Sequence, residues 1–420
     1  MTSRASCRSL SNGLFATDPR AYVYDMEREN TDILIAGGGI AGLTAAAAFG
    51  TAGFNVICVD PSPPVTDAGA EGADLRTTAF LQPARQFLDA AGIWPRLAVH
   101  ATPLQVMRIV DASGAVPVIR DFDAADISDM PFGWNLPNWL LRREILARLA
   151  ELTAVNFLPC VSFTRMLTRE NSALVTLSDG SQITARLVIG ADGRDSAVRQ
   201  AAGINVKTLR YGQKALTFAV THSEPHHNIS TEIHRSGGPF TLVPLPDHDG
   251  RPCSSVVWMD HGADILRLST LDPMAFEVEA TARAAHLYGP LKLAGKRGVW
   301  PIISQIATRM TADRVALVAE AAHVLPPIGA QGLNMSLADL HYLLQLATTH
   351  PGTLGNRAML DAYNRHRHPE ALLRVAGVDA LNRVSMAGSP LVQTLRINGI
   401  KALHGVTPIR RGLMKLGLGG

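Results

Sequence analysis

The chain has 420 residues, of which 47% are hydrophobic and 18% are charged, and its formal net charge is +3. A chain of this length holds about two to three domains, and this composition allows a large core and argues against global disorder. The small positive charge gives no reason to expect a nucleic-acid partner. The four cysteines form no C-x-x-C pair and have no metal-ligand spacing, so we expect reduced thiols in a cytoplasmic protein.

The first thirty residues contain arginines and serines, but no apolar stretch of the kind that a secretory signal needs. We expect residues 1–30 to be a disordered extension, or a segment upstream of a true start at Met26, with a targeting segment as the alternative. No apolar run in the sequence reaches the roughly 20 residues of a membrane-spanning helix. The folded part is therefore expected to begin at Thr31.

A glycine-rich turn over residues 37–42 follows the first apolar run, residues 32–36. That run suits a buried parallel strand, the alanine-rich residues 43–49 suit a helix, and residues 54–59 suit the next strand. Strand, glycine turn, helix and strand in this order predict a unit that binds a dinucleotide. This first unit does not distinguish NAD from FAD.

Each glycine of this turn has a physical reason. Gly37 permits the tight turn, and Gly39 lets backbone N–H groups approach a pyrophosphate at the positive end of the helix. Gly42 allows the helix and the strand to pack closely. Asp60 comes 23 residues after Gly37, near the expected distance for a carboxylate that binds ribose hydroxyls.

A second glycine-bearing segment ends a strand in the middle of the chain. Residues 174–177 and 182–185 flank an Asp-Gly turn and predict a hairpin, and the second strand continues as a buried strand to Gly190. Asp192 and Gly193 follow. Open α/β sheets bind ligands at the carboxyl ends of their strands, so Asp192 is a candidate cofactor contact. An ordinary turn remains the alternative.

The third segment runs from an apolar strand, residues 314–319, to a helical pattern over residues 333–346. Prolines and glycines deliver the chain to the start of this helix, whose free N–H groups carry partial positive charge. A helix end of this kind would stabilise the negative pyrimidine edge of a reduced flavin. His323, between the strand and the helix, is either a loop histidine with a structural hydrogen bond or a proton-transfer group.

On these three segments the chain resembles a group A flavoprotein monooxygenase with the p-hydroxybenzoate hydroxylase fold. Within that class it is similar to the ubiquinone-biosynthesis hydroxylases of the 2-polyprenyl-6-methoxyphenol hydroxylase family. The resemblance extends from residue 31 to about residue 418, and it includes further matching segments at residues 74–80, 92–94, 236–240, 243–245 and 378–383.

The resemblance implies an α/β fold: a Rossmann-like, GR2-type FAD-binding domain, a β-sheet substrate domain and a helical C-terminal tail. The alternating apolar and polar residues between positions 205 and 300 agree with a sheet there. The implied FAD-binding domain is discontinuous. The expected divisions are residues 31–100, 131–200 and 301–370 for the FAD-binding domain, 101–130 and 201–300 for the substrate domain, and 371–420 for the tail.

The resemblance also implies roles for single residues. Arg76, in the active-site loop, and His323 are the candidate catalytic residues, and we expect no metal. Family members usually have Gly-Asp where this chain has Ala319 and Glu320, and we expect the glutamate to keep the role in FAD binding. FAD contacts are implied for Gly37, Gly39, Gly42, Asp60, Arg142 (with Arg143 as its alternative), Asp192, Glu320, Gly332, Leu333 and Asn334.

The activity that the resemblance implies is hydroxylation of the aromatic ring of a polyprenylated phenol in ubiquinone biosynthesis. NADH or NADPH would reduce the FAD, and O₂ would then give a C4a-hydroperoxyflavin that attacks the ring. Other ubiquinone-biosynthesis enzymes are expected partners. Two alternatives stay open: a hydroxylase of a soluble aromatic compound, and a flavin-binding scaffold subunit of a biosynthetic complex.

The C-terminal tail mixes basic and apolar residues, because Asp379 is the last acidic residue of the chain. This pattern indicates either a packed helix pair with a solvated basic face or contact with an anionic membrane surface, here the inner membrane. His226, His227 and His234 do not have the spacing of a metal site, and we expect these histidines to be exposed.

Overall fold

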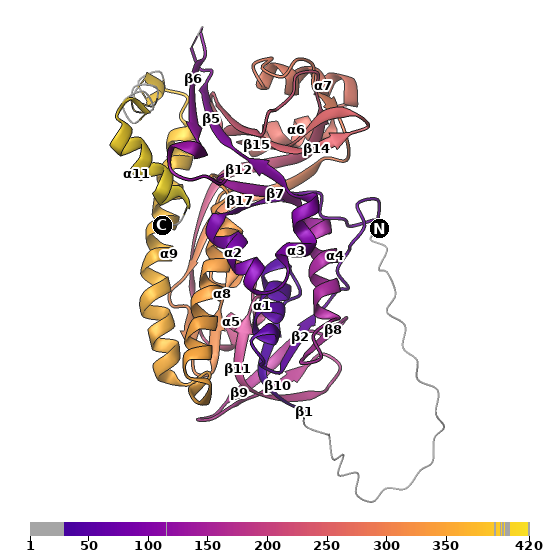
Figure 1. The fold of residues 1–420 in the computed structure, drawn as a ribbon, viewed down its shortest axis with the longest axis vertical. Helices are drawn as coiled ribbons and strands as arrows, with labels where there is room; N and C mark the ends of the chain where they lie inside the picture. Colours follow the sequence, from indigo (N-terminus) through magenta and orange to yellow (C-terminus); the bar gives the residue numbers. More distant parts are fainter. Residues whose placement is uncertain are drawn as a thin grey trace, which may run out of the picture.

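The computed structural model describes residues 29–114, 116–389, 392–394, 396, 399 and 404–418, so residues 1–28 of the expected extension lie outside it. Two large sheets occupy the two halves of the molecule in Figure 1, with a small sheet between them. The lower half carries the glycine-bearing segments. The long helix α9 (Arg357–Met386) runs along one side of both halves.

The lower sheet has eight strands, and its centre is parallel in the order β19-β11-β1-β2-β8. The first strand begins at Glu29, two residues before the expected start. Its central residues are fully buried in a hydrophobic core to which both helices and the neighbouring strands of the sheet contribute. The strands are β1 (Glu29–Ala36), β2 (Val56–Asp60), β8 (Val155–Pro159), β9 (Phe163–Thr168), β10 (Ala173–Leu177), β11 (Gln182–Gly190), β18 (Thr311–Ala312) and β19 (Val315–Leu317).

The register of this sheet brings the three glycine-bearing segments to one edge. Ala36 pairs with Gly190, and Gly190 pairs with Leu317, so β1, β11 and β19 end at the same level. The predicted hairpin is confirmed, since β10 and β11 pair antiparallel across the Asp-Gly turn. The helices of this half are α1 (Ile40–Thr51), α2 (Gln82–Ala90), α3 (Trp94–Leu97), α4 (Asn138–Leu149), α5 (Ala197–Ala201) and α8 (Gln331–Thr349).

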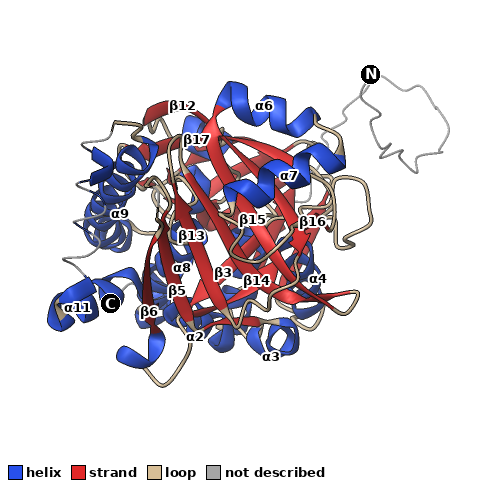
Figure 2. Cartoon of the chain, turned by 90° about the horizontal axis from the view of Figure 1, so that it is seen from above, coloured by secondary structure: helices blue, strands red, loops and turns tan. Residues whose placement is uncertain are grey.

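The upper sheet has nine strands and is mostly antiparallel. Its outer face packs against α6 (Gly262–Thr270) and α7 (Pro273–Arg283), which Figure 2 shows lying over the strands, and its inner face looks toward the lower half. The expected sheet is thus confirmed. The strands are β5 (Val106–Asp111), β6 (Val118–Asp123), β12 (Val206–Thr221), β13 (Ile229–His234), β14 (Pro239–His248), β15 (Arg251–His261), β16 (Lys292–Leu293), β17 (Gly298–Ala307) and β20 (His323–Val324).

A third, three-stranded sheet joins the two halves, and it contains β3 (Thr77–Leu81), β4 (Thr102–Leu104) and β7 (Gly133–Pro137). Two hydrogen bonds tie it to the upper sheet. The hydroxyls of Thr77 and Ser255 lie 2.8 Å apart, and Asn135 Nδ2 donates to the Pro244 carbonyl at 2.9 Å. The predicted active-site loop comes directly before β3, so it lies where the halves meet.

The C-terminal part is helical, as predicted. Helix α9 is continuous over 30 residues and includes Pro369, so it crosses the expected start of the tail at residue 371. Helix α11 (Thr407–Leu418) lies beside the β5–β6 hairpin (Figure 1). In the described part of the chain, no helix combines the length and the apolar character that crossing a bilayer requires. Four short 3₁₀ turns complete the fold, over Ala98–His100, Ala124–Asp126, Ala319–Ala321 and Pro351–Thr353.

Candidate active site

The first glycine turn has the geometry of a phosphate-binding loop. Gly37 has a φ of +111°, which only glycine adopts readily, and an added Cβ would lie 2.3 Å from the Ala191 carbonyl oxygen. A Cβ on Gly42 would lie 1.8 Å from the Gly37 oxygen, so glycine is required where helix and strand meet. A Cβ on Gly39 would meet no described atom within 4 Å, so the space in front of this residue is open.

Asp60 lies at the end of β2, beside this turn. Its Oδ2 accepts the Gly38 N–H at 2.6 Å, and its Oδ1 accepts the Ser62 N–H at 2.9 Å. A carboxylate has about four acceptor positions, so two remain for a ligand hydroxyl. Asp60 therefore orients the glycine turn and still has the capacity that ribose binding requires.

The helices that begin at the first and third segments lack side-chain caps. Helix α1 starts after Gly39 and α8 after Ala330, and neither residue gives a side-chain hydrogen bond to the helix end. Helices α2, α4 and α6 also lack such a cap, whereas the side chain of Asn356 caps α9. The free N–H groups of α1 and α8 provide partial positive charge for an anionic ligand, which fits the phosphates and the flavin ring of FAD.

The middle and late segments are held together by arginines. Arg199 is buried, and its guanidinium donates to the carbonyls of Ala321 at 3.0 Å and Arg194 at 2.8 Å. Burial lowers the pKa of Arg199. Asp192 accepts the hydroxyl of Ser196, and it also accepts the Val198 N–H at 3.0 Å. Asp192 thus orders the start of α5 at the edge where the strands end.

Glu320 lies just past β19, and its side chain is 47% exposed. Its carboxylate is 3.4 Å from Arg194 Nε, so the late segment contacts the middle one through this pair. The preceding residue, Ala319, has a φ of +54°, a left-handed conformation that is unfavourable for alanine. This chain therefore differs from the usual Gly-Asp pair of the family in two ways: the backbone is strained at Ala319, and the acidic side chain of Glu320 is longer.

His323 is 2% exposed, and its Nε2 lies 2.6 Å from Asp339 Oδ2 on α8. Arg367 Nε donates to the other oxygen of Asp339 at 2.7 Å, so a buried imidazole, carboxylate and guanidinium form one row. His323 Nδ1 is enclosed and has no hydrogen-bond partner among the described residues. The structural hydrogen bond exists, and the proton-transfer role stays a prediction.

The first turn of α8 contains Gly332, Leu333 and Asn334. An added Cβ on Gly332 would meet no described atom within 4 Å, so this turn also faces open space. The Asn334 side chain accepts the Leu81 N–H at 2.9 Å and donates to the Ala79 carbonyl at 2.8 Å. Asn334 thus joins the start of α8 to strand β3.

Arg76 and Arg142 converge on one carboxylate, that of Asp74. Arg76 donates to it twice, from Nε at 2.8 Å and from Nη2 at 2.7 Å, whereas Arg142 Nη2 lies 3.6 Å away. Burial opposes ionisation of Asp74, but the hydrogen bonds and charge of Arg76, with help from Asn138 and Arg142, lower its pKa below the usual value. Arg143 instead pairs with Glu144 at 2.8 Å.

The expectation that these three histidines are exposed was right for His227 and wrong for His226 and His234. His227 is exposed and His226 is half-buried, but His234 is only 9% exposed. His234 Nε2 lies 2.9 Å from Glu232, and its Nδ1 lies 3.2 Å from the Ser385 hydroxyl on α9. The packing of α9 against the upper sheet covers this histidine, which no pattern in the local sequence indicated.

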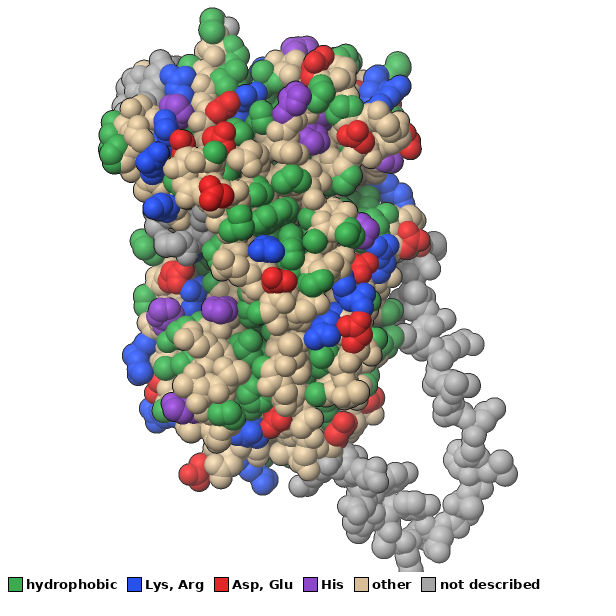
Figure 3. Space-filling model, viewed as in Figure 1, with side chains coloured by type: hydrophobic (Ala, Val, Ile, Leu, Met, Phe, Trp, Pro, Cys, Tyr) green, Lys and Arg blue, Asp and Glu red, His purple; other side chains and the backbone are tan. Residues whose placement is uncertain are grey.

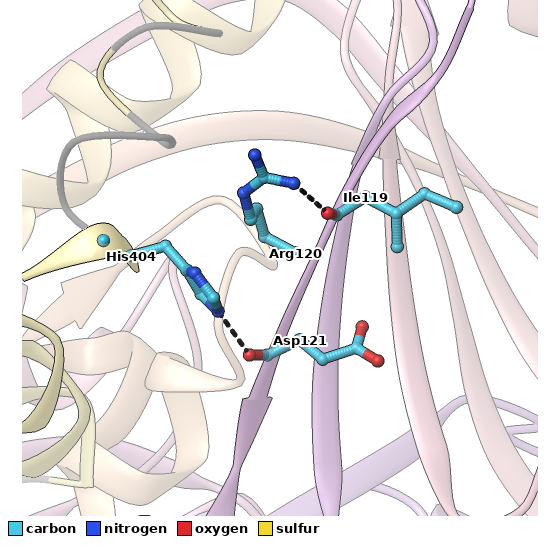
Figure 4. Close-up of a pocket in the computed structure, with 5 residues that line it drawn as sticks. Ile119, Arg120, Asp121 and His404 are labelled. Carbon is cyan, nitrogen blue, oxygen red and sulfur yellow. Dashed lines mark hydrogen bonds between the residues drawn. The ribbon is translucent and has the colours of Figure 1, made fainter. Parts of the chain in front are cut away.

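A groove of about 530 Å³ separates β6 from the C-terminal tail, and Figure 4 shows four of its lining residues labelled. His404 Nε2 is 2.9 Å from the Asp121 carbonyl oxygen across the groove, and Arg120 donates to the Ile119 carbonyl at 2.6 Å. None of its lining residues belongs to the glycine-bearing segments. The groove is therefore not part of the expected cofactor site.

The family model described as "FAD binding domain" matches residues 30–376. The chain belongs to this FAD-binding family. This FAD-binding protein is an FAD-dependent monooxygenase, and NAD(P)H is the reductant typical of the family. The resemblance stated from the sequence is confirmed.

Two curated relatives cover nearly the whole FAD-binding chain. The ubiquinone hydroxylase UbiL of Rhodospirillum rubrum is 34% identical over 98% of this chain and 95% of its own length. The 3-demethoxyubiquinol 3-hydroxylase of Escherichia coli is 25% identical over 94% of this chain and 100% of its own. The crystal structure of p-nitrophenol 4-monooxygenase PnpA from Pseudomonas putida DLL-E4 is similar with a TM-score of 0.75 at 18% identity, over 93% of this chain and 99% of that one, which supports the fold.

Sequence reasoning missed the charged residues that hold the segments of this FAD-binding protein together. Asp339 is one of them, and a signal for it existed: it lies between apolar residues on the buried face of α8, where an unpaired carboxylate would be costly. Its partner Arg367 and the buried Arg199 come from segments far apart in the chain. Only the folded structure shows what these two arginines contact.

Proposed function

We propose that this protein hydroxylates the aromatic ring of a polyprenylated phenol in ubiquinone biosynthesis. The observation that carries the proposal is the match to a protein named ubiquinone hydroxylase over 98% of this chain. A second relative of nearly full coverage is named for hydroxylation of demethoxyubiquinol. NAD(P)H and O₂ are the proposed co-substrates.

The proposed FAD contacts begin with the ADP half. The Gly37–Gly42 turn and the uncapped end of α1 would hold the pyrophosphate, and Asp60 would bind the ribose. The guanidinium of Arg142 makes no hydrogen bond to any described residue, and its ion pair with Asp74 is loose at 3.6 Å, so its N–H groups can still bind a phosphate or a ribityl hydroxyl. The open end of α8, with Gly332 and Leu333, would lie under the ring.

When bound, FAD supplies two-electron reduction by NAD(P)H and the activation of O₂. The chain supplies position and electrostatics. The N–H groups of α8 would stabilise negative charge on the flavin ring, and Glu320 would bind the ribityl chain from the end of β19. Arg76 would close the active-site loop at the junction of the two halves, and the inner face of the upper sheet would cover the substrate ring.

A substrate with a polyprenyl chain requires an apolar surface. Figure 3 shows hydrophobic side chains gathered across the middle of one face, at about the level of β7 in Figure 1. An apolar band of this kind on a surface is typical of a binding site. It supports a lipophilic substrate over a small soluble phenol.

Peripheral contact of the tail with the inner membrane is the finer part of the proposal. Of the basic residues in the tail, Arg383 pairs with Asp379, Arg396 with Asp111, and Arg410 with Asp126. Lys401 lies outside the described residues, and the described basic residues that remain after Asp379 are Arg411 and Lys415, which are exposed on α11 beside the exposed Ile409. These residues support contact with an anionic lipid surface.

The test is a quinone-intermediate profile of a strain that lacks this protein, together with spectroscopy of the purified enzyme. We expect a yellow protein with flavin absorbance that NAD(P)H bleaches and air restores, and a strain that accumulates a prenylated phenol lacking one hydroxyl group. The accumulated compound would also identify the ring carbon.

Other outcomes are equally informative. NAD(P)H oxidation that small soluble phenols stimulate as well as prenylated ones, with a normal quinone profile, would favour a hydroxylase of a soluble compound. Bound FAD that NAD(P)H does not reduce, with loss of ubiquinone in the deletion strain, would favour a flavin-binding scaffold. A colourless protein that refuses FAD would contradict all three.

A further inference from the structure

The carboxylate of Asp74 lies at the centre of a small network at the junction of the two halves. Its side chain is 7% exposed, and it accepts two hydrogen bonds from the Arg76 guanidinium, one from the Arg76 backbone N–H at 3.2 Å and one from Asn138 Nδ2 at 3.0 Å. A bidentate arginine–carboxylate pair fixes the plane of the guanidinium as well as its position. Asp74 therefore sets the orientation of Arg76.

The other side of Arg76 lies against an aromatic ring of the upper sheet. The guanidinium carbon is 4.0 Å from the ring centre of Trp300 on β17, and the indole N–H donates to the Thr217 hydroxyl at 3.0 Å on β12. Trp300 is 37% exposed, although tryptophan is usually more deeply buried. Arg76 thus lies between a carboxylate of the lower half and an indole of the upper half.

This stack continues a line of contacts between the halves. Thr77, the next residue, reaches Ser255 of the upper sheet, and Asn135 on the adjacent strand reaches Pro244. Burial opposes the charge of Arg76, but the hydrogen bonds and charge of Asp74, with a smaller contribution from the charge of Glu320, raise its pKa. The stack of Arg76 on Trp300 is therefore one of several contacts that join the two halves.

We propose that Asp74, Arg76 and Trp300 form a closure that keeps water out of the place where substrate and flavin meet, and that Asp74 is its positioning residue. This inference rests on the proposed function. Exclusion of water matters in such an enzyme, because a reactive oxygen species decays when the site is open. With the closure intact, one oxygen atom enters the ring and the other leaves as water.

With the closure open, the electrons are lost to peroxide. The balance is NAD(P)H + H⁺ + O₂ → NAD(P)⁺ + H₂O₂, so the enzyme consumes reductant without hydroxylating the ring. A cation–π contact at a partly exposed site shifts an equilibrium about two- to five-fold. Loss of the stack should therefore raise the fraction of turnovers that end in H₂O₂ by a factor of this size.

The test uses the full-length holoenzyme and the variant Asp74→Asn, which keeps the shape of the side chain and removes the charge. We expect Asp74→Asn to raise H₂O₂ released per NAD(P)H and to lower product per NAD(P)H. A matched control is Asp121→Asn, because Arg108 binds Asp121 with the same 2.8 and 2.7 Å hydrogen bonds on the β5–β6 hairpin. The control should leave the H₂O₂ fraction unchanged.

A second measurement does not depend on turnover. Of the five tryptophans, only Trp300 is exposed. Acrylamide quenching of tryptophan fluorescence therefore reports on how well the Arg76 guanidinium shields the Trp300 ring. Asp74→Asn should increase quenching, and it should cause no further increase when Trp300 is already phenylalanine. Trp300→Ala tests the closure even if Asp74→Asn does not fold. It should raise the release of H₂O₂ as Asp74→Asn does. Trp300→Phe keeps an aromatic ring beside Arg76, so it should stay more tightly coupled than Trp300→Ala.

The outcomes separate the two claims. A wild-type enzyme that forms no hydroxylated product would defeat the proposed function. The closure would be overturned, and the proposed function kept, by the following result. The wild type couples NAD(P)H oxidation to hydroxylation, Asp74→Asn and Trp300→Ala couple it equally well, and fluorescence quenching is unchanged.

Discussion

Ala319 shows how one residue can reveal strain that a motif comparison only suggests. Its φ of +54° lies in the left-handed region, where a Cβ costs about 1–2 kcal/mol. Glycine, the usual family residue at this position, adopts the same backbone without that cost. The alanine therefore destabilises the turn that presents Glu320.

Ala319→Gly should stabilise the protein. Relief of the left-handed strain exceeds the added entropy of the unfolded chain, so we expect a gain of up to about 1 kcal/mol in the free energy of unfolding. Urea unfolding of the apoprotein measures it. Ala202→Gly is the control, because Ala202 has a φ of −79° and its change should destabilise by about 0.4–1 kcal/mol. A loss of stability in Ala319→Gly would refute the argument.

Glu320 should matter through its carboxylate and not through its length. Its pair with Arg194 is exposed and contributes at most about 1 kcal/mol, so substitution should not unfold the protein. Glu320→Ala should lose FAD on purification far more than Glu320→Asp does. The ratio of flavin to protein absorbance measures retention, and equal FAD content in both variants would count against the role.

At the scale of elements, the C-terminal tail is anchored by one buried ion pair. Arg396 Nε lies 2.6 Å from Asp111 Oδ2 at the end of β5, and the two side chains are 5% and 0% exposed. Burial opposes ionisation of Asp111, but Arg396 and Ser113 lower its pKa. The pair therefore stabilises the fold above the unfolded pKa of about 3.9, and its contribution is lost as the pH falls through the lower folded value.

Asp111→Asn should destabilise the protein strongly at neutral pH. It leaves the buried charge of Arg396 without a counter-charge, with only the carbonyls of Val384 and Arg235 as partners, which costs about 3–5 kcal/mol. Asp126→Asn removes the more exposed pair with Arg410 and should cost less than about 1 kcal/mol. Urea unfolding compares the two variants, and the penalty for Asp111→Asn should shrink in acid. Equal penalties at neutral pH would contradict the anchoring role.

The strands and helices around the glycine turns were predictable because their patterns are local. The apolar run before Gly37 and the Asp-Gly hairpin each specify their structure within a few residues, and β1, β10 and β11 follow the prediction. The ion pairs were not predictable, since Asp111 and Arg396 are 285 residues apart. The site residues could be named from motifs, but the Asp74 network needed the folded contacts.

At the scale of the whole molecule, the question is how the protein would meet the lipophilic substrate that we propose. Helix α11 presents Arg411, Lys415 and Ile409 to solvent at the side of the molecule, beside the β5–β6 hairpin (Figure 1). Each basic residue near an anionic bilayer contributes about 1 kcal/mol to binding. The two charges together suit a weak and reversible contact.

Arg411→Glu combined with Lys415→Glu should weaken binding to phosphatidylglycerol vesicles at least about ten-fold, because two attractive charges become repulsive. Co-sedimentation at low salt measures it. Arg357→Glu is the control, since its side chain is 89% exposed on α9, and it should leave binding unchanged. If the double variant still sediments with the vesicles as the wild type does, α11 is not the contact.

The strand order of the lower sheet has a consequence for biosynthesis. Strand β19 lies next to β11 but is made more than a hundred residues later, and α8 follows it. A chain emerging from the ribosome therefore exposes the edge of β11 until residues 315–317 are released. The nascent protein has to avoid mispairing at that edge while residues 191–314 are made, and it can enclose its cofactor only after α8 has followed.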